Sequence, residues 1–270
     1  MNGVSPGRSP LGHGGLRHAR ATGWRRIAAT LCLGALAGMS PGWAAGAPLV
    51  VALDFVPPVH EAGAKYRTPA TIDSALAEDL ARRLDRPLAK VGEGAFDISI
   101  TTLGNSGGTP ASMTVIPLGY RAAPMAIMRT DSTIRRWDEL RGRTVCVAAG
   151  GTHVGDLQGR YGAVEIVHPS LTEALVALRI GECDALVHDS VLLEELLRLP
   201  EWKKFSRRLQ GRPRSTLALV VPQADREVIG RVREVAAAWK AAALTDSLVR
   251  NAIRDIAFEV YVEQEVPDCH

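Results

Sequence analysis

Short apolar runs alternate with segments of helical periodicity along most of this chain, and this alternation constrains the fold more than any other feature. Between 72 and 84, Ile72, Leu76, Leu80 and Leu84 recur every four residues, which is typical of one apolar face of a helix. Such alternation predicts α/β units built on largely parallel sheets. Apolar runs of strand length lie at 48–56, 96–102, 115–118, 125–128, 144–149, 164–167, 183–187 and 216–221.

The predicted helices fill most of the intervals between these strands. Besides 72–84, the apolar spacing predicts helices over 171–180 and 191–199, and a short helical turn at 137–140. The C-terminal segment 229–253 is predicted to be helical throughout, with one break near Thr245 and Asp246.

The N-terminus has the three parts of a secretory signal peptide. Its first 26 residues contain five arginines and no acidic residue, and a mostly apolar run of 13 residues, 27–39, follows. Ser40, Pro41 and Gly42 then precede small residues around Ala44. We interpret 1–44 as a signal peptide cleaved after Ala44, which places the mature protein in the periplasm. An uncleaved membrane anchor is the alternative, although the run of 13 residues is shorter than the about 20 apolar residues that a membrane span needs. Export through the Sec pathway and export through the twin-arginine pathway both stay open.

Removal of the signal peptide changes the charge of the protein. The whole chain carries a net charge of +3, whereas residues 45–270 hold 27 basic and 29 acidic residues, a net charge of −2. Nothing in this composition indicates binding to nucleic acid. The mature length is sufficient for one or two compact domains.

Three cysteines follow the signal peptide, namely Cys146, Cys183 and Cys269. An exported protein can hold a disulfide, but an odd number leaves at least one thiol free or paired between molecules. We favour two buried unpaired residues on strands and one thiol in the tail, with a disulfide as the alternative. The spacing contains no C-x-x-C and no histidine at metal-binding distance, so we expect neither a metal site nor a cofactor.

Five segments in order resemble motifs of one protein family. They are VALDFVPP (51–58), IDSALAEDLARRL (72–84), FDISITTL (96–103), the stretch from IPLGY to AAGGT (116–152), and LTEALVALRIGECDALVHDS (171–190). Together they resemble the opening strand, first helix, crossover strands, Gly-Thr loop and strand-end aspartate of the bacterial extracellular solute-binding proteins of family 3, which bind polar amino acids for ABC importers.

The resemblance implies a fold and a partner. The implied fold is a two-lobed, periplasmic-binding-protein-like (type II) α/β architecture, each lobe a mainly parallel sheet flanked by helices. Mapped onto this chain, lobe 1 covers 45–125 plus 216–270, and lobe 2 covers 126–215. The resemblance further implies that a monomer closes on a small-molecule ligand and delivers it to an inner-membrane ABC permease.

In open α/β sheets, ligands bind at the carboxyl ends of strands, and polar residues follow several of the predicted strands. Backbone N–H groups of the Gly150–Thr152 turn suit an anion, and a carboxylate at 189 suits an ammonium. The resemblance implies that Asp189 takes a ligand amino group and that Tyr120 lines the cleft or hinge. The predicted ligand-binding residues are Asp54, Thr101, Thr102, Tyr120, Gly151, Thr152, His153 and Asp189.

Each of these residues also has a purely structural interpretation. Asp189 is a good N-cap for the helix that follows it, and Asp54 could bind its own turn. The Gly150-Gly151 pair could be only a tight strand-to-helix connection, and Phe55 is as consistent with the core as with the wall of a site.

The chain departs from the family pattern at two places. The segment 103–113, LGNSGGTPASM, has no arginine, whereas the resemblance implies one there to clamp a ligand carboxylate. The connection at 89–95 is also short, without the additional helix that the family has.

The predicted function is therefore solute binding for an ABC importer, for an amino acid or an organic acid, without enzymatic activity. A non-transport accessory or sensor role, for example beside a quinoprotein dehydrogenase, and a dehydratase-type enzyme are the alternatives.

Overall fold

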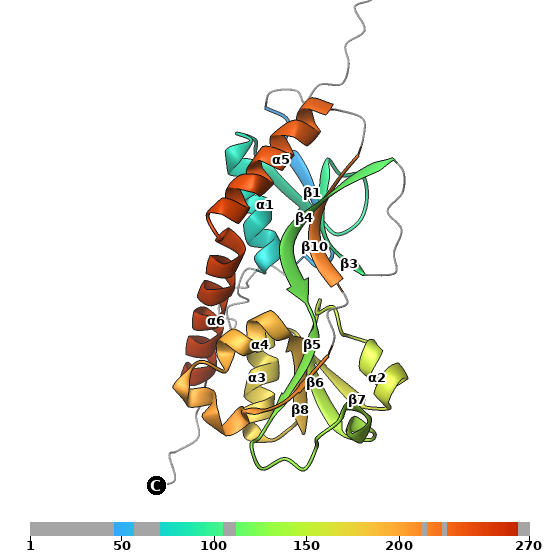
Figure 1. Ribbon diagram of the computed structural model, residues 1–270, viewed down its shortest axis with the longest axis vertical. Helices are drawn as coiled ribbons and strands as arrows, with labels where there is room; N and C mark the ends of the chain where they lie inside the picture. Colours follow the sequence, from blue (N-terminus) through green and yellow to red (C-terminus); the bar gives the residue numbers. More distant parts are fainter. Residues whose placement is uncertain (1–45, 57–70, 105–111, 212–214, 223–225, 264–270) are drawn as a thin grey trace, which may run out of the picture. The chain divides into compact units, whose positions relative to one another are not determined.

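The computed structural model describes residues 46–56, 71–104, 112–211, 215–222 and 226–263 (Figure 1). All of them belong to one compact unit, residues 41–270. The predicted signal peptide, the loop that begins at Pro57, and Cys269 lie outside the described residues.

The first of two five-stranded sheets has the strand order β2-β1-β3-β10-β4. β1 pairs in parallel with β2 and β3, whereas β10 runs antiparallel between β3 and β4. These strands are β1 (Leu49–Leu53), β2 (Leu88–Val91), β3 (Ile98–Gly104), β4 (Met113–Ala122) and β10 (Ser215–Pro222).

The second sheet has the order β7-β6-β8-β5-β9. β6 pairs in parallel with β7 and β8, whereas β5 runs antiparallel between β8 and β9. These strands are β5 (Pro124–Met128), β6 (Thr144–Ala148), β7 (Val164–His168), β8 (Ala185–Asp189) and β9 (Arg207–Gln210).

Helices cover both sheets (Figure 1). α1 (Ile72–Arg83) and α5 (Arg226–Ala241) share one core cluster with the first sheet. α3 (Leu171–Ile180), α4 (Ser190–Leu196), α6 (Leu244–Val262) and the 3-10 turn η2 (Pro200–Phe205) form a core on one face of the second sheet. α2 (Asp156–Tyr161) and the 3-10 turn η1 (Trp137–Leu140) pack on its other face.

Local sequence explains where the principal helices begin and end. Thr71 is the N-cap of α1, and its hydroxyl accepts a hydrogen bond from the Ser74 N–H at 3.4 Å. Ser170 and Glu173 form a reciprocal capping box at the start of α3, which ends at Gly181 with a φ of 85°. Both helices then bury an apolar face, as the four-residue spacing predicts.

The predicted two-sheet α/β fold class is confirmed, although both sheets are mixed rather than mainly parallel. The cause is the way that the chain passes between them. β4 of the first sheet continues into β5 of the second, and the chain returns from β9 to β10. The two passages approach one another at Gly211, whose N–H donates to the Pro124 carbonyl at 2.7 Å. A Cβ at 211 would lie 2.5 Å from Pro124 Cγ, so this approach requires glycine.

The sequence analysis missed four short elements, β2, α2, η2 and β9. β2 lies in the segment interpreted as a connection, and the sequence of β9, RRLQ, has no apolar run. The break in the C-terminal helical segment, which was predicted near Thr245 and Asp246, falls at Ala243, which has a left-handed φ of 47°. Ala243 carries no sequence signal for such a turn, since glycine or asparagine is the usual residue there.

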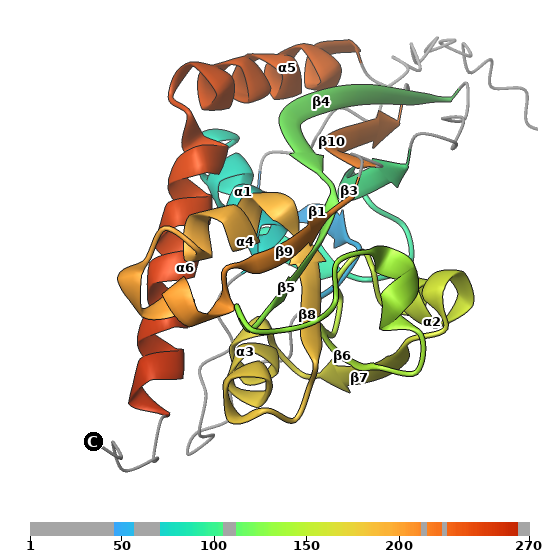
Figure 2. The ribbon, with the colours of Figure 1, turned by 60° about the horizontal axis from the view of Figure 1, so that its bottom comes forward.

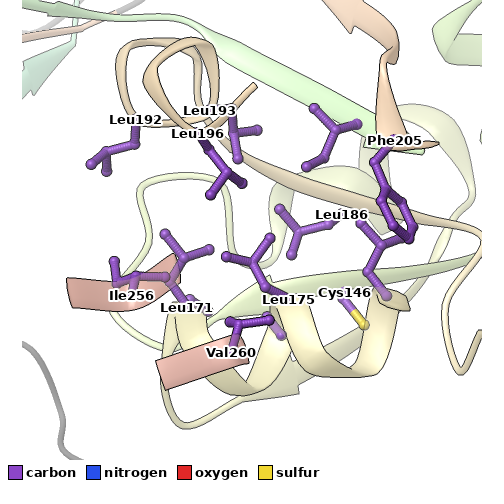
Figure 3. Packing of buried hydrophobic residues seen from close by; sticks show 14 of the residues in the cluster. Cys146, Leu171, Leu175, Leu186, Leu192, Leu193, Leu196, Phe205, Ile256 and Val260 are labelled. Carbon is purple, nitrogen blue, oxygen red and sulfur yellow. The ribbon is translucent and has the colours of Figure 1, made fainter. Parts of the chain in front are cut away.

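α6 contacts helices of both sheets, namely α1 and α5 as well as α3 and α4 (Figure 2). Side chains of α6 pack in one cluster with those of α3 and α4, and Figure 3 shows Ile256 and Val260 beside Leu171 and Leu175 of α3. The lobe boundaries near 125 and 215 remain predictions. Among the described helices, none is both long and apolar enough for a membrane span.

A disulfide joins Cys146 of β6 to Cys183, which precedes β8. Our preference for two unpaired cysteines was therefore wrong. β6 and β8 are neighbouring parallel strands, in which Cys146 is in register with Leu186, and this pairing brings the two Cα atoms to 5.8 Å. The sequence hides this proximity, because 37 positions separate the two cysteines.

Candidate functional site

A cavity of about 180 Å³ is lined by residues of both sheets, at the carboxyl ends of β1, β6 and β8. Side chains of α1, α4 and α6 complete its wall, among them Ile72, Leu192 and Ile256. Thr101 and His153 contact lining residues through hydrogen bonds. The other predicted site residues line the cavity directly: Asp54, Thr102, Tyr120, Gly151, Thr152 and Asp189.

Asp54 stands directly after β1 and is held by the neighbouring strand. Its Oδ1 accepts a hydrogen bond from the Thr101 hydroxyl at 2.6 Å, and its Oδ2 accepts from the Thr102 N–H at 2.8 Å. These bonds run to β3 and not to the turn of Asp54 itself. β3 thus fixes the orientation of this carboxylate at the edge of the cavity.

Asp189 is the last residue of β8 and the N-cap of α4, but its side chain makes no capping bond. Its Oδ1 lies 3.0 Å from His153 Nε2 and accepts from the Thr152 hydroxyl at 3.1 Å. Its Oδ2 accepts from the Tyr120 hydroxyl at 3.3 Å. An ionised carboxylate only accepts hydrogen bonds, so the His153 nitrogen that faces it carries the proton.

The surroundings of Asp189 keep it ionised. Burial alone raises the pKa of Asp189, but the hydrogen bond from His153, the electrostatic influence of the neighbouring His188 and His153 rings and the bond from Thr152 together lower it below 3.8. Burial, together with the charge of Asp189 and the hydrogen bond to it, raises the pKa of Tyr120. The Tyr120 hydroxyl therefore stays protonated and donates.

The Gly150-Gly151 turn lines the cavity, but the Gly151 N–H already donates to the Ala148 carbonyl at 3.0 Å. This amide is thus not available as the anion donor that the sequence suggested. Gly150 has a φ of 73°, and a Cβ there would lie 2.3 Å from Cγ of Phe55. Since Phe55 follows β1 and Gly150 follows β6, their contact connects the two sheets.

Replacement of Gly150 with alanine is expected to destabilise the protein by about 1–2 kcal/mol from the left-handed backbone alone, and further through the clash with Phe55. A double-mutant cycle of Gly150→Ala and Phe55→Ala, measured by urea unfolding, separates the two causes. We expect Phe55→Ala to relieve part of the cost of Gly150→Ala. Strict additivity of the two effects would contradict contact between these residues.

Two titratable lining residues, Asp73 and His188, were not recognised as site residues from the sequence. Asp73 was considered only as a helix cap, yet it lines the cavity from the first turn of α1. His188 also lines it, and its Nδ1 accepts the Asp189 N–H at 2.8 Å. Burial lowers the pKa of His188, the charge of Asp189 raises it, and His153 lowers it, so the net shift is downward. The strand-end rule selects polar residues after strands, so it cannot select a residue on a helix such as Asp73.

No protein-family model matches this chain, and no curated protein matches it. Solved structures of low sequence identity do. The substrate-binding protein of an amino acid ABC transporter is 19% identical, with a TM-score of 0.51 over 76% of this chain and 99% of the other. The amino acid ABC transporter substrate-binding protein AbpA from Streptococcus pneumoniae, bound to L-arginine, is 17% identical, with a TM-score of 0.51 over 77% and 95%.

An ancestral cationic amino acid solute-binding protein is 17% identical, with a TM-score of 0.53 over 77% of this chain and 96% of the other. The matches cover nearly the whole of each of these proteins. The two mixed sheets, the paired crossovers and the cavity between the sheets therefore form the two-lobed type II periplasmic-binding-protein fold that these substrate-binding proteins share.

Proposed function

We propose that the protein is a periplasmic solute-binding protein that captures a small, positively charged polar ligand in the cavity between its two sheets. The observation that carries this proposal is the charge of the lining. Asp54, Asp73 and Asp189 line the cavity, and none of the described lining residues is lysine or arginine. Carboxylates in a partly buried cavity favour an ammonium or guanidinium ligand over an organic acid.

The similar proteins support this class of ligand. One is bound to L-arginine, and another is described as a cationic amino acid solute-binding protein. The same comparison supports delivery of the ligand to an ABC permease. In this proposal the ligand contacts both sheets, and rotation about the paired crossovers at Pro124 and Gly211 opens and closes the cavity as a hinge.

A thermal-shift screen of the purified protein tests this proposal. The panel contains basic and neutral amino acids, simple amines and small organic acids. A ligand at about 100 times its dissociation constant stabilises the folded protein by about 2.7 kcal/mol, which corresponds to a rise in Tm of roughly 5–10 °C for a chain of this size. We expect this rise only with cationic compounds.

Two outcomes of the screen would contradict the proposal. A rise in Tm with organic acids and not with amines would overturn the proposal that the ligand is positively charged. No shift with any compound would favour the accessory or sensor role over solute capture.

A further inference from the structure

The cavity contains more negative charge than one ammonium group neutralises. Asp54 and Asp73 line it from the first sheet and its helix α1, and Asp189 lines it from the second sheet. The inference drawn from this charge rests on the proposed solute-binding function and specifies its ligand.

Asp54 and Asp73 both line the cavity, and the charge of Asp54 acts on the carboxyl group of Asp73. Burial raises the pKa of Asp73, hydrogen bonds from Thr71 and Ser74 lower it, and the charge of Asp54 raises it, with a net upward shift. Two like charges in a partly buried site destabilise one another, and a cation beside both removes that cost. This end of the cavity therefore favours a cationic group.

The second sheet provides a second place for a cation at the same cavity. Asp189 is mostly buried, and a carboxylate offers about four acceptor positions. Hydrogen bonds from His153, Thr152 and Tyr120 occupy three of these positions. Tyr120 is the only one of these donors on Oδ2, so this oxygen has room for one further donor, such as an ammonium group.

A ligand carboxylate finds no cationic partner among the described residues that line the cavity. His188 accepts the Asp189 N–H at Nδ1, so this ring is neutral and contributes no charge. His153 directs its protonated Nε2 at Asp189, and the Gly151 N–H is taken by the Ala148 carbonyl. A carboxylate in this cavity would meet three carboxylates of the same sign.

We propose that the ligand is a linear dication without a carboxylate, of the diamine class, with one ammonium bound by Asp54 and Asp73 and the other by Asp189. One ammonium group then pairs with carboxylates of the first sheet and its helix, and the other pairs with a carboxylate of the second sheet. The ligand thus bridges the two halves of the cavity, and its two charges offset the repulsion among the three aspartates.

Isothermal titration calorimetry with matched pairs of compounds tests this inference. The diamines are 1,3-diaminopropane, 1,4-diaminobutane and 1,5-diaminopentane, and each is paired with the amino acid that adds one carboxylate to it: 2,4-diaminobutyrate, ornithine and lysine. 1-Aminobutane serves as the compound with a single charge. We expect the best diamine to bind at least about tenfold more tightly than its amino acid, which adds a repelled carboxylate, and than 1-aminobutane, which lacks the second charge-assisted contact.

Asp73→Asn provides the second measurement, and Glu78→Gln is its matched control. Both substitutions remove one negative charge from α1, but Glu78 is exposed, pairs with Lys90 and does not line the cavity. We expect Asp73→Asn to reduce the preference for the diamine over 1-aminobutane by about tenfold. Glu78→Gln should leave this preference unchanged. A purely structural role of Asp73 would lower Tm without changing the preference.

The outcomes separate this inference from the proposed function. Tighter binding of ornithine or lysine than of the corresponding diamine would overturn the carboxylate-free dication and leave a cationic solute-binding protein. Equal binding of 1-aminobutane and the diamine would overturn the second ammonium site. If neither diamines nor amino acids bind, the inference fails, and the wider thermal-shift panel decides whether solute binding fails with it.

Discussion

Asp189→Asn is expected to weaken ligand binding by about 30-fold or more, because removal of one partner of a buried, hydrogen-bonded charge pair costs about 2–5 kcal/mol. Asparagine keeps the shape of the side chain and one acceptor oxygen. It loses the negative charge that, in the proposed function, pairs with the cationic ligand, and its amide nitrogen cannot accept the hydrogen bond of the Tyr120 hydroxyl, which Asp189 Oδ2 accepts at 3.3 Å.

This substitution needs a control for net charge and a check on stability. Asp131 is exposed, pairs with Arg129 and lies in the part of the protein that is built on the second sheet. Asp131→Asn therefore removes one negative charge without touching the cavity, and it should leave affinity unchanged. Calorimetry gives the affinity of each variant, and thermal unfolding gives its Tm. An affinity for the cationic ligand that is unchanged in Asp189→Asn would exclude Asp189 from the site.

The sequence placed most of the candidate site correctly on strand ends, and the reason is physical. In both sheets, an apolar strand ends where its chain leaves the core, and polar residues such as Asp54 and Asp189 follow at that point. The parallel strands β1 and β3 share one edge, and so do β6 and β8. A rule that depends only on strand ends therefore gathers residues that are far apart in the sequence.

The features that sequence reasoning missed depend on contacts between distant segments. Asp73 reaches the cavity because α1 packs across the first sheet, and Phe55 meets Gly150 because the segments that follow β1 and β6 both border the cavity. The hydrogen bonds that fix Asp189 come from residues 36, 37 and 69 positions away. Local periodicity contains no information about such pairings, whereas it predicts α1 and α3 well, since their caps and apolar faces are local.

Loss of the Cys146–Cys183 disulfide is expected to lower the free energy of unfolding by about 4 kcal/mol, because the bond closes a loop whose ends are 37 positions apart and so restricts the unfolded chain. For a chain of this size, this loss corresponds to a fall in Tm of roughly 10 °C. Urea unfolding of the purified protein with and without a thiol reductant measures it. The Cys146→Ala/Cys183→Ala variant is the control, since the reductant should not change its stability.

The burial of this disulfide decides how the experiment must be performed and what would contradict it. Cys146 is 0% exposed and Cys183 is 5% exposed, so a reductant reaches the bond only when the core between β6, β8 and α3 opens. Reduction should therefore be slow in the native protein and fast in urea. After removal of residues 1–44, Cys269 is the single cysteine outside the disulfide, so a thiol count on the denatured, oxidised protein should give one. A count of three, with equal stability in both conditions, would show that the cysteines are unpaired. The part of the fold that is built on the second sheet would then be stable through non-covalent interactions, without a covalent cross-link.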